Sequence, residues 1–283
     1  MTHIRDTSMA VLLLAAANAC AALPADAQIP PSGAQTANSA IPYARVADLV
    51  VAAPLIIDAT VRSTSALKAA ESPGLIPGNV RLYIEADVVG LIRGTAGVPP
   101  RIAYLADVPL DSRGRVPRMK RLRVLVFAQM VPGRPREVQL VRPDAQLAWT
   151  PALDATVRAV TAEAVRPDAA PVITRVTNAT HVRGNLVGEG ETTIFLATER
   201  GDPVSLTVLR RPGQQPTWSV ALGEVVTDSA GPARPDTLLW YRLACGLPEA
   251  VPESALTANT PEDAAIAQED YAFISRSLGP CTR

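Results

Sequence analysis

The sequence predicts a mainly β protein with helices, of the α+β class: a barrel of short strands, then an antiparallel sheet covered by two C-terminal helices. Short runs of β-branched and aliphatic residues recur along the chain between clusters of Gly, Pro and Asp. Segments that begin at Pro151, Thr237 and Thr260 are expected to be helical. With 283 residues, 48% hydrophobic, 19% charged and no net charge, the composition excludes global disorder and a dedicated polyanion binder.

Residues 1–27 have the form of a signal peptide. Arg5 precedes an uncharged apolar run from Met9 to Leu23, and the segment closes with Ala25-Asp26-Ala27, which fits the small-x-small rule for cleavage. We therefore expect export, with cleavage before Gln28, and a periplasmic or secreted protein. A buried N-terminal helix is the alternative. No other stretch is long and apolar enough to predict a transmembrane anchor.

The cysteines indicate the same compartment. If Cys20 leaves with the signal peptide, Cys245 and Cys281 remain, and two cysteines in an exported protein are most simply explained by a disulfide bond. Two alternatives stay open. Cys20 could instead be acylated in a lipoprotein, although the residues before it fit that signal poorly, and the two later cysteines could be free thiols.

The first module is predicted to be a barrel over residues 43–150. It follows a flexible segment, residues 28–42, which is rich in Gln, Pro, Ser and Ala and has no apolar periodicity. Five or six short strands in such a length predict a closed or nearly closed barrel. The predicted strands are Leu55–Thr64, Arg81–Val89, Arg101–Leu105, Leu122–Ala128, Val138–Val141 and Gln146–Trp149.

Three segments of this module, Ala47–Val51, Val88–Gly94 and Leu125–Phe127, occur in an order that resembles the OB-fold barrel of netrin-like modules and tissue inhibitors of metalloproteinases. The resemblance covers residues 44–150 and implies an OB-like β-barrel. Members of this family carry disulfides within the barrel, and the inhibitors present an N-terminal cysteine to a protease metal. This chain has no cysteine between Ala21 and Ala244, so the resemblance implies the shape without the inhibitory chemistry.

A connecting helix and linker are predicted over residues 151–170. Pro151 suits the first helical position, and four apolar residues then recur at helical spacing. This stripe is expected to pack on the barrel. Its residues are Leu153, Val157, Val160 and Ala164.

The second module, residues 171–283, is predicted to be an antiparallel sheet covered by two helices. The helices are expected from Thr237 to Ala244, capped by Asp236, and from Thr260 to Leu278, so that a Cys245–Cys281 disulfide would join them. Residues 188–281 also resemble secreted proteobacterial proteins of unknown function, which implies a compartment but no activity. The predicted strands are Val172–Val176, Thr192–Ala197, Val204–Leu209 and Trp218–Val226.

The residues available for catalysis are few. His181 is the only histidine beyond the signal peptide, which excludes a multi-histidine zinc site, and it is expected on the surface or in a turn. The carboxylate pairs Glu85/Asp87 and Glu189/Glu191 are expected to face solvent. No nucleophile elbow, phosphate-binding loop or dinucleotide fingerprint is present, and no cofactor or metal is predicted.

The most distinctive charge feature is a basic cluster with no acidic residue inside it. Guanidinium groups bind phosphate and carboxylate, so we predict contact with an anionic envelope polymer, a lipid headgroup or an acidic protein surface. The alternative is a solvated loop compensated by acids such as Asp111 and Glu137. Nucleic acid is not an expected partner, because no aromatic residues interleave with the cluster. The cluster comprises Arg113, Arg115, Arg118, Lys120, Arg121 and Arg123.

These features together predict an exported, non-enzymatic binding or scaffolding protein of the bacterial cell envelope. Two alternatives remain at this stage. The first is an envelope hydrolase that acts through a pair of carboxylates, and the second is a secreted protease inhibitor, which depends on the barrel resemblance alone.

Overall fold

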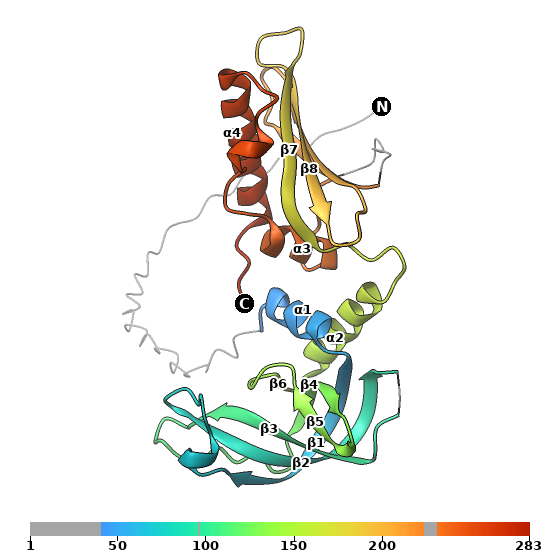
Figure 1. The fold of residues 1–283 in the computed structure, drawn as a ribbon, viewed down its shortest axis with the longest axis vertical. Coiled ribbons are helices and arrows are strands. Elements are labelled where there is room, and N and C mark those ends of the chain that lie inside the picture. Colours follow the sequence, from blue (N-terminus) through green and yellow to red (C-terminus); the bar gives the residue numbers. More distant parts are fainter. Residues whose placement is uncertain (1–40, 96, 224–230) are drawn as a thin grey trace, which may run out of the picture. The chain divides into compact units, whose positions relative to one another are not determined.

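The computed structural model describes residues 41–95, 97–223 and 231–283, and it confirms the predicted architecture (Figure 1). A closed five-stranded β-barrel is followed by a separate four-stranded antiparallel sheet with C-terminal helices. The predicted signal peptide, Cys20 and nearly all of the segment 28–42 lie outside the described residues.

The barrel has the strand order β1-β2-β3-β5-β4, and pairing between β1 and β4 closes it. All neighbours are antiparallel except β3 and β5, which run parallel and share one residue pair, Ala103 with Glu137. This arrangement is the OB-like barrel that was predicted. Its strands are β1 (Leu55–Ala66), β2 (Asn79–Arg93), β3 (Arg101–Pro109), β4 (Arg123–Val131) and β5 (Arg134–Leu140), with β6 (Gln146–Ala148) paired to β4.

The strand β1 holds the barrel together. Its first five residues, Leu55 to Ala59, are all buried, whereas an exposed sheet would bury every second residue. Along this stretch β1 pairs with β2 on one edge and with β4 on the other. Register shifts against β2 occur at three points, and such bulges let a strand bend around a barrel.

Two helices complete the core of the first module. The helix α1 (Tyr43–Ala52) was not predicted, and Leu49 and Val50 on it are completely buried. The helix α2 (Pro151–Ala164) begins as predicted, because the Thr150 hydroxyl accepts a hydrogen bond from the Leu153 backbone N–H at 3.1 Å. Its apolar stripe packs into the same core as the barrel strands.

The second module is an antiparallel sheet of order β10-β9-β8-β7. The helix α4 contacts β7 and β8 and lies along them in Figure 1. The strand β7 is much longer than predicted and includes His181, while β10 ends at Leu222, and the predicted end at Val226 lies outside the described residues. The elements are β7 (Ile173–Arg183), β8 (Gly190–Thr198), β9 (Val204–Arg210), β10 (Thr217–Leu222), α3 (Leu238–Gly246) and α4 (Pro261–Leu278).

The cap predicted for α3 was wrong by one residue. Thr237, with an extended backbone, accepts a hydrogen bond from the Trp240 N–H at 3.2 Å, whereas Asp236 has a left-handed φ of 56°. An N-cap needs the extended conformation, so Thr237 takes this role. For α4 the predicted start is confirmed, because Thr260 caps the Asp263 N–H at 3.2 Å.

The predicted disulfide is present in the structure. Cys245, near the end of α3, is bonded to Cys281, which follows α4, and their Cα atoms lie 5.2 Å apart. In the described part of the chain, none of the helices combines the length and the apolar character that crossing a bilayer requires.

We predict that the double variant Cys245→Ser/Cys281→Ser unfolds at lower denaturant concentration than the native chain. Loop-closure entropy for a separation of 36 residues gives about 3–4 kcal/mol of stabilisation. Urea unfolding under oxidising conditions, followed by circular dichroism, measures the difference. Addition of a reductant should destabilise the native chain and leave the double variant unchanged, and equal sensitivity of the two chains would contradict the prediction.

Candidate binding site

The six basic residues of the predicted cluster lie between the end of β3 and the start of β4, and all six are exposed. We call residues 113–123 the basic loop. Its first turn is built on Asp111, whose carboxylate accepts hydrogen bonds from the backbone N–H groups of Arg113 (2.8 Å) and Arg115 (2.9 Å). The Arg115 side chain adds an ion pair at 2.9 Å. Hydrogen bonds from Arg115 and Arg113 to the carboxylate hold the pKa of Asp111 below its usual value.

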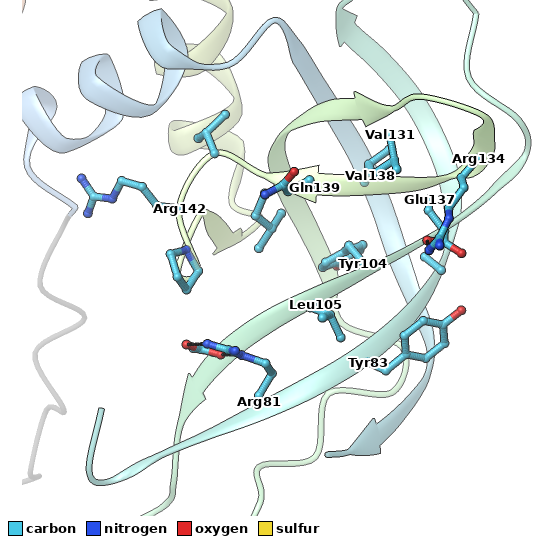
Figure 2. A pocket seen from close by; sticks show the side chains of 15 residues that line it. Arg81, Tyr83, Tyr104, Leu105, Val131, Arg134, Glu137, Val138, Gln139 and Arg142 are labelled. Carbon is cyan, nitrogen blue, oxygen red and sulfur yellow. Dashed lines mark hydrogen bonds and ion pairs between the residues drawn. The ribbon is translucent and has the colours of Figure 1, made fainter. Parts of the chain in front are cut away.

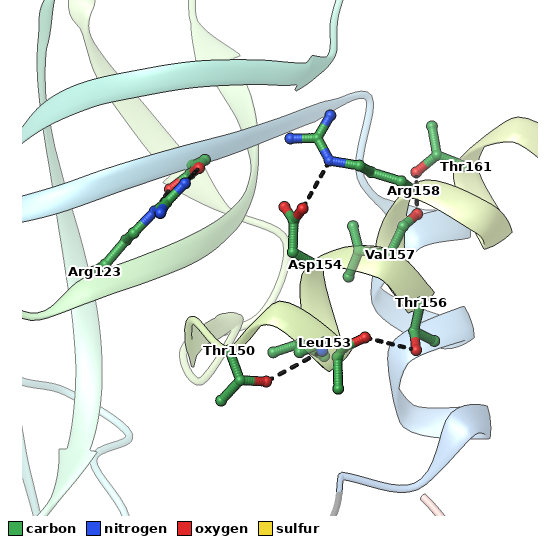
Figure 3. A network of polar contacts seen from close by, with 10 residues as sticks. Arg123, Thr150, Leu153, Asp154, Thr156, Val157, Arg158 and Thr161 are labelled. Atoms are coloured by element: carbon green, nitrogen blue, oxygen red, sulfur yellow. Dashed lines mark hydrogen bonds and ion pairs between the residues drawn. The ribbon is translucent and has the colours of Figure 1, made fainter.

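Arg123 makes intramolecular contacts that stabilise the fold and does not serve as a contact for a partner. Its guanidinium makes two hydrogen bonds, of 2.9 and 2.5 Å, to the carboxylate of Asp58, which is only 2% exposed. The same group lies 3.9 Å from the ring centre of Trp149, a cation–π contact. Figure 3 shows Arg123 beside the first turn of α2, where Asp154 and Arg158 form a separate ion pair.

The free part of the basic loop is therefore smaller than the sequence predicted. Arg115 and Arg123 are neutralised by Asp111 and Asp58. For the other four, no ion pair occurs among residues 41–95, 97–223 and 231–283, so their charges remain available to an anionic partner. These four are Arg113, Arg118, Lys120 and Arg121.

A second surface, which the sequence did not reveal, is a cavity of about 690 Å³ on the barrel (Figure 2). We call it the barrel groove. It opens where β3 and β5 pair only at Ala103 and Glu137. Further along, the Asp107 N–H donates to the Pro143 carbonyl at 2.8 Å and joins β3 to the segment that follows β5.

The barrel groove has an apolar floor and a charged rim. Tyr83 on β2 and Leu105 on β3 are directly opposed in the sheet and are 39% and 46% exposed. At the rim, the Arg81 guanidinium makes two hydrogen bonds to Asp107, at 2.6 and 2.8 Å, which raise the pKa of Arg81. Arg134 donates to Glu137 at 2.9 Å. Fixed donors and acceptors thus stand beside an apolar surface.

The position of the groove has a physical precedent in the fold. OB barrels bind oligonucleotides and oligosaccharides on the face of their second and third strands, below the loops that join strands 1–2 and 4–5. The barrel groove is lined by β2 and β3 on one side and by β5 and the segment after it on the other, and Val131 and Arg134 belong to the β4–β5 hairpin. The alternating burial along β2 indicates that Tyr83 points outward, but the opposition of Tyr83 and Leu105 requires the strand register.

The expected location of His181 was wrong. Its side chain is 7% exposed, lies within β7 and places Nδ1 2.9 Å from the Thr192 hydroxyl. Burial lowers the pKa of His181, and the nearby carboxylates of Asp270 and Asp263 act against this effect. The prediction failed because the strand that was expected to end at Val176 continues as β7 to Arg183, and His181 lies in this extension.

The two carboxylate pairs singled out in the sequence do not form acid–base pairs. On β2, Glu85 accepts a hydrogen bond from the Ser63 hydroxyl at 2.7 Å, and Asp87 accepts one from Arg101 at 3.1 Å. The Glu189 carboxylate accepts hydrogen bonds from two backbone N–H groups of its own loop, and Glu191 is exposed on β8.

We predict that Arg123→Ala lowers the thermal unfolding midpoint, because it leaves the buried Asp58 carboxylate without its cation. Arg118→Ala, in the same loop, is the matched control and should leave the midpoint unchanged, since its side chain is exposed and has no ion pair in the described residues. Differential scanning calorimetry of both variants checks this. Equal midpoints for the two would contradict the structural role of Arg123.

Within the described residues, no three His, Cys, Asp or Glu side chains are grouped so that they could hold a metal ion. Neither a protein-family model nor a curated protein matches the chain.

Proposed function

We propose that the chain is an exported, non-enzymatic binding protein of the bacterial cell envelope that holds an oligosaccharide in the barrel groove. The observation that carries the proposal is the groove itself, a cavity of about 690 Å³ with an apolar floor and a hydrogen-bonding rim on the ligand-binding face of an OB-like barrel. The basic loop remains a predicted second contact for an anionic partner.

The chemistry of the groove suits a sugar. A pyranose ring has an apolar face that packs on aromatic and aliphatic side chains, and its hydroxyl groups both donate and accept hydrogen bonds. Tyr83 and Leu105 provide the apolar surface. At the rim Asp107 and Glu137 supply acceptors and their arginine partners supply donors. Because each carboxylate is matched by a guanidinium, these pairs favour a ligand without net charge.

The same contacts favour binding over hydrolysis. Glycoside cleavage requires one carboxylic acid in its protonated form next to one that is ionised. Both groove carboxylates, Asp107 and Glu137, instead accept hydrogen bonds from guanidinium groups, so each is already occupied by an arginine partner. An envelope hydrolase is therefore the second interpretation, and a protease inhibitor is less supported, because it has only the resemblance of the barrel behind it.

The envelope location is supported by two features of different kinds. The N-terminal 27 residues carry the pattern of a cleavable leader. The bond between Cys245 and Cys281 is typical of a compartment outside the reducing cytosol.

We predict that Tyr83→Ala weakens binding of an envelope-type oligosaccharide, with tetra-N-acetylchitotetraose as the probe. Loss of the stacking surface should cost about 1 kcal/mol, or about five-fold in Kd, by isothermal titration calorimetry. The matched control is Phe195→Ala, which removes a comparably exposed aromatic side chain, 47% accessible, from β8 of the second module. Equal losses in both variants, or absence of binding by the native chain, would contradict the proposed function.

We also predict that the mature protein begins at Gln28 and is recovered from the periplasm or the medium. Intact-mass spectrometry of the protein from its native host measures the N-terminus and detects acylation of Cys20. An unprocessed chain that begins at Met1 and carries reduced cysteines in the cytosol would contradict export.

A further inference from the structure

A polar chain runs through the core of the second module, remote in sequence from the barrel groove. Arg210, at the end of β9, donates to the Asp270 carboxylate at 2.8 Å through Nε, and Asp270 on α4 is completely buried. The Thr192 hydroxyl on β8 donates to the other Asp270 oxygen at 2.5 Å. The chain ends at His181 on β7, whose Nδ1 lies 2.9 Å from the Thr192 oxygen.

These contacts fix which ring nitrogen of His181 carries the proton. A carboxylate that is paired with a guanidinium only accepts hydrogen bonds. Asp270 therefore accepts the one hydrogen bond that the Thr192 hydroxyl can donate. The Thr192 oxygen can then act only as an acceptor toward His181, and Nδ1 must be the donor. In the neutral imidazole, Nε2 is consequently left with a free lone pair.

The neutral imidazole is also the form that its surroundings favour. The side chain is buried among β7, β8 and α4, and burial lowers the pKa of His181. Gly190, opposite the end of β7, makes room for the ring edge: an added Cβ there would lie 2.5 Å from Cε1 and 2.8 Å from Nε2. Any other residue at position 190 would displace the imidazole.

His181 lines a cavity of about 500 Å³ together with residues of the β7–β8 loop, residues 184–189. We call it the loop cavity. In the described residues no side chain or backbone group hydrogen-bonds to His181 Nε2. Six side chains that define the character of the cavity are His181, Arg183, Leu186, Glu189, Arg210 and Ile266.

The charges around the loop cavity favour a cation. Arg183 is neutralised by Asp263 at 2.6 Å, and Arg210 is shared between Asp270 and Glu269, at 2.6 and 3.1 Å. Glu189 has no arginine partner in the described residues, and only its Oε2 receives the backbone N–H groups of the loop. The cavity thus presents an imidazole acceptor and an unneutralised carboxylate next to the apolar Leu186 and Ile266.

We propose that the loop cavity is a second ligand site, for a small primary ammonium ion with an apolar body, and that His181 Nε2 and Glu189 are its hydrogen-bond acceptors. The ammonium group offers N–H donors to both acceptors, and its alkyl chain packs on Leu186 and Ile266. Thr192 and Asp270 are positioning residues, because they act on the ligand through the tautomer of His181.

The test uses the full chain labelled with ¹⁵N-histidine and three probes of equal carbon number: pentylammonium, 1-pentanol and pentanoate. His181→Gln assigns the imidazole signals, because His3 is the other histidine. Before any probe is added, the ring nitrogens of His181 should show the Nδ1–H tautomer. Pentylammonium should then shift Nε2 in a saturable manner, pentanol should bind about ten-fold more weakly because it lacks the charge, and pentanoate should give no shift.

Two variants distinguish the loss of this ligand site from a general effect of mutation on the fold. Glu189→Gln keeps the oxygen that accepts the backbone N–H groups but removes the charge, so pentylammonium should bind about five-fold more weakly. Its matched control, Glu191→Gln, changes an exposed carboxylate that does not line the loop cavity and should bind like the native chain. Thr192→Val should abolish the tautomer preference, and if this buried variant does not fold, Glu189→Gln still tests the ligand.

The proposal would be overturned by an Nε2–H tautomer in the free protein, by the absence of a saturable shift with pentylammonium, or by equal binding of the three probes. Equal effects of Glu189→Gln and Glu191→Gln would overturn the role of Glu189 and with it the ammonium site.

Discussion

The double pairing of β1 is the interaction on which the first module depends. Residues Leu55 to Thr60 pair with β4, and Ile56 onward pair with β2, so one strand closes the barrel from both sides. Burial of both faces from Leu55 to Ala59 explains why this part of β1 is a run of apolar residues. The exception, Asp58, is tolerated because Arg123 from β4 neutralises it.

Closure through β1 also determines where the strand pairing of the barrel is sparsest. With β1 joined to β4, the remaining strand β5 has to lie between β4 and β3. It pairs with β4 over several residues but with β3 only at Ala103 and Glu137. The barrel groove lies beside this sparse pairing, so the cavity is a consequence of the strand order and its ligand chemistry is set by the side chains that flank it.

The sequence predicted the elements better than the sites, for a physical reason. Alternation and turn residues are local signals, and they located the strands of both sheets and the start of α4. The disulfide followed from the cysteine count in a chain with a predicted signal peptide. A binding surface depends on residues that are distant in the chain. Tyr83 and Leu105 become one surface only through the β2–β3 register, and His181 gains a partner only because β8 places Thr192 beside it.

The basic loop shows the same limit of prediction from sequence. Its charge density was visible in the sequence. That Asp111 and Asp58 neutralise Arg115 and Arg123 became clear only from the structure. Asp111 lies close enough in sequence to be anticipated, whereas Asp58 comes from β1. Helix α1 was missed although its buried residues recur at helical spacing, because it is only ten residues long and no side-chain N-cap marks its start.

The proposal that the barrel groove binds an oligosaccharide is tested most directly by mapping where the ligand binds. Amide chemical shifts of the ¹⁵N-labelled chain should be recorded as tetra-N-acetylchitotetraose is added. The perturbed amides should belong to β2, β3 and the β4–β5 hairpin. Perturbations confined to the basic loop or to the second module, with β2 and β3 unaffected, would contradict it.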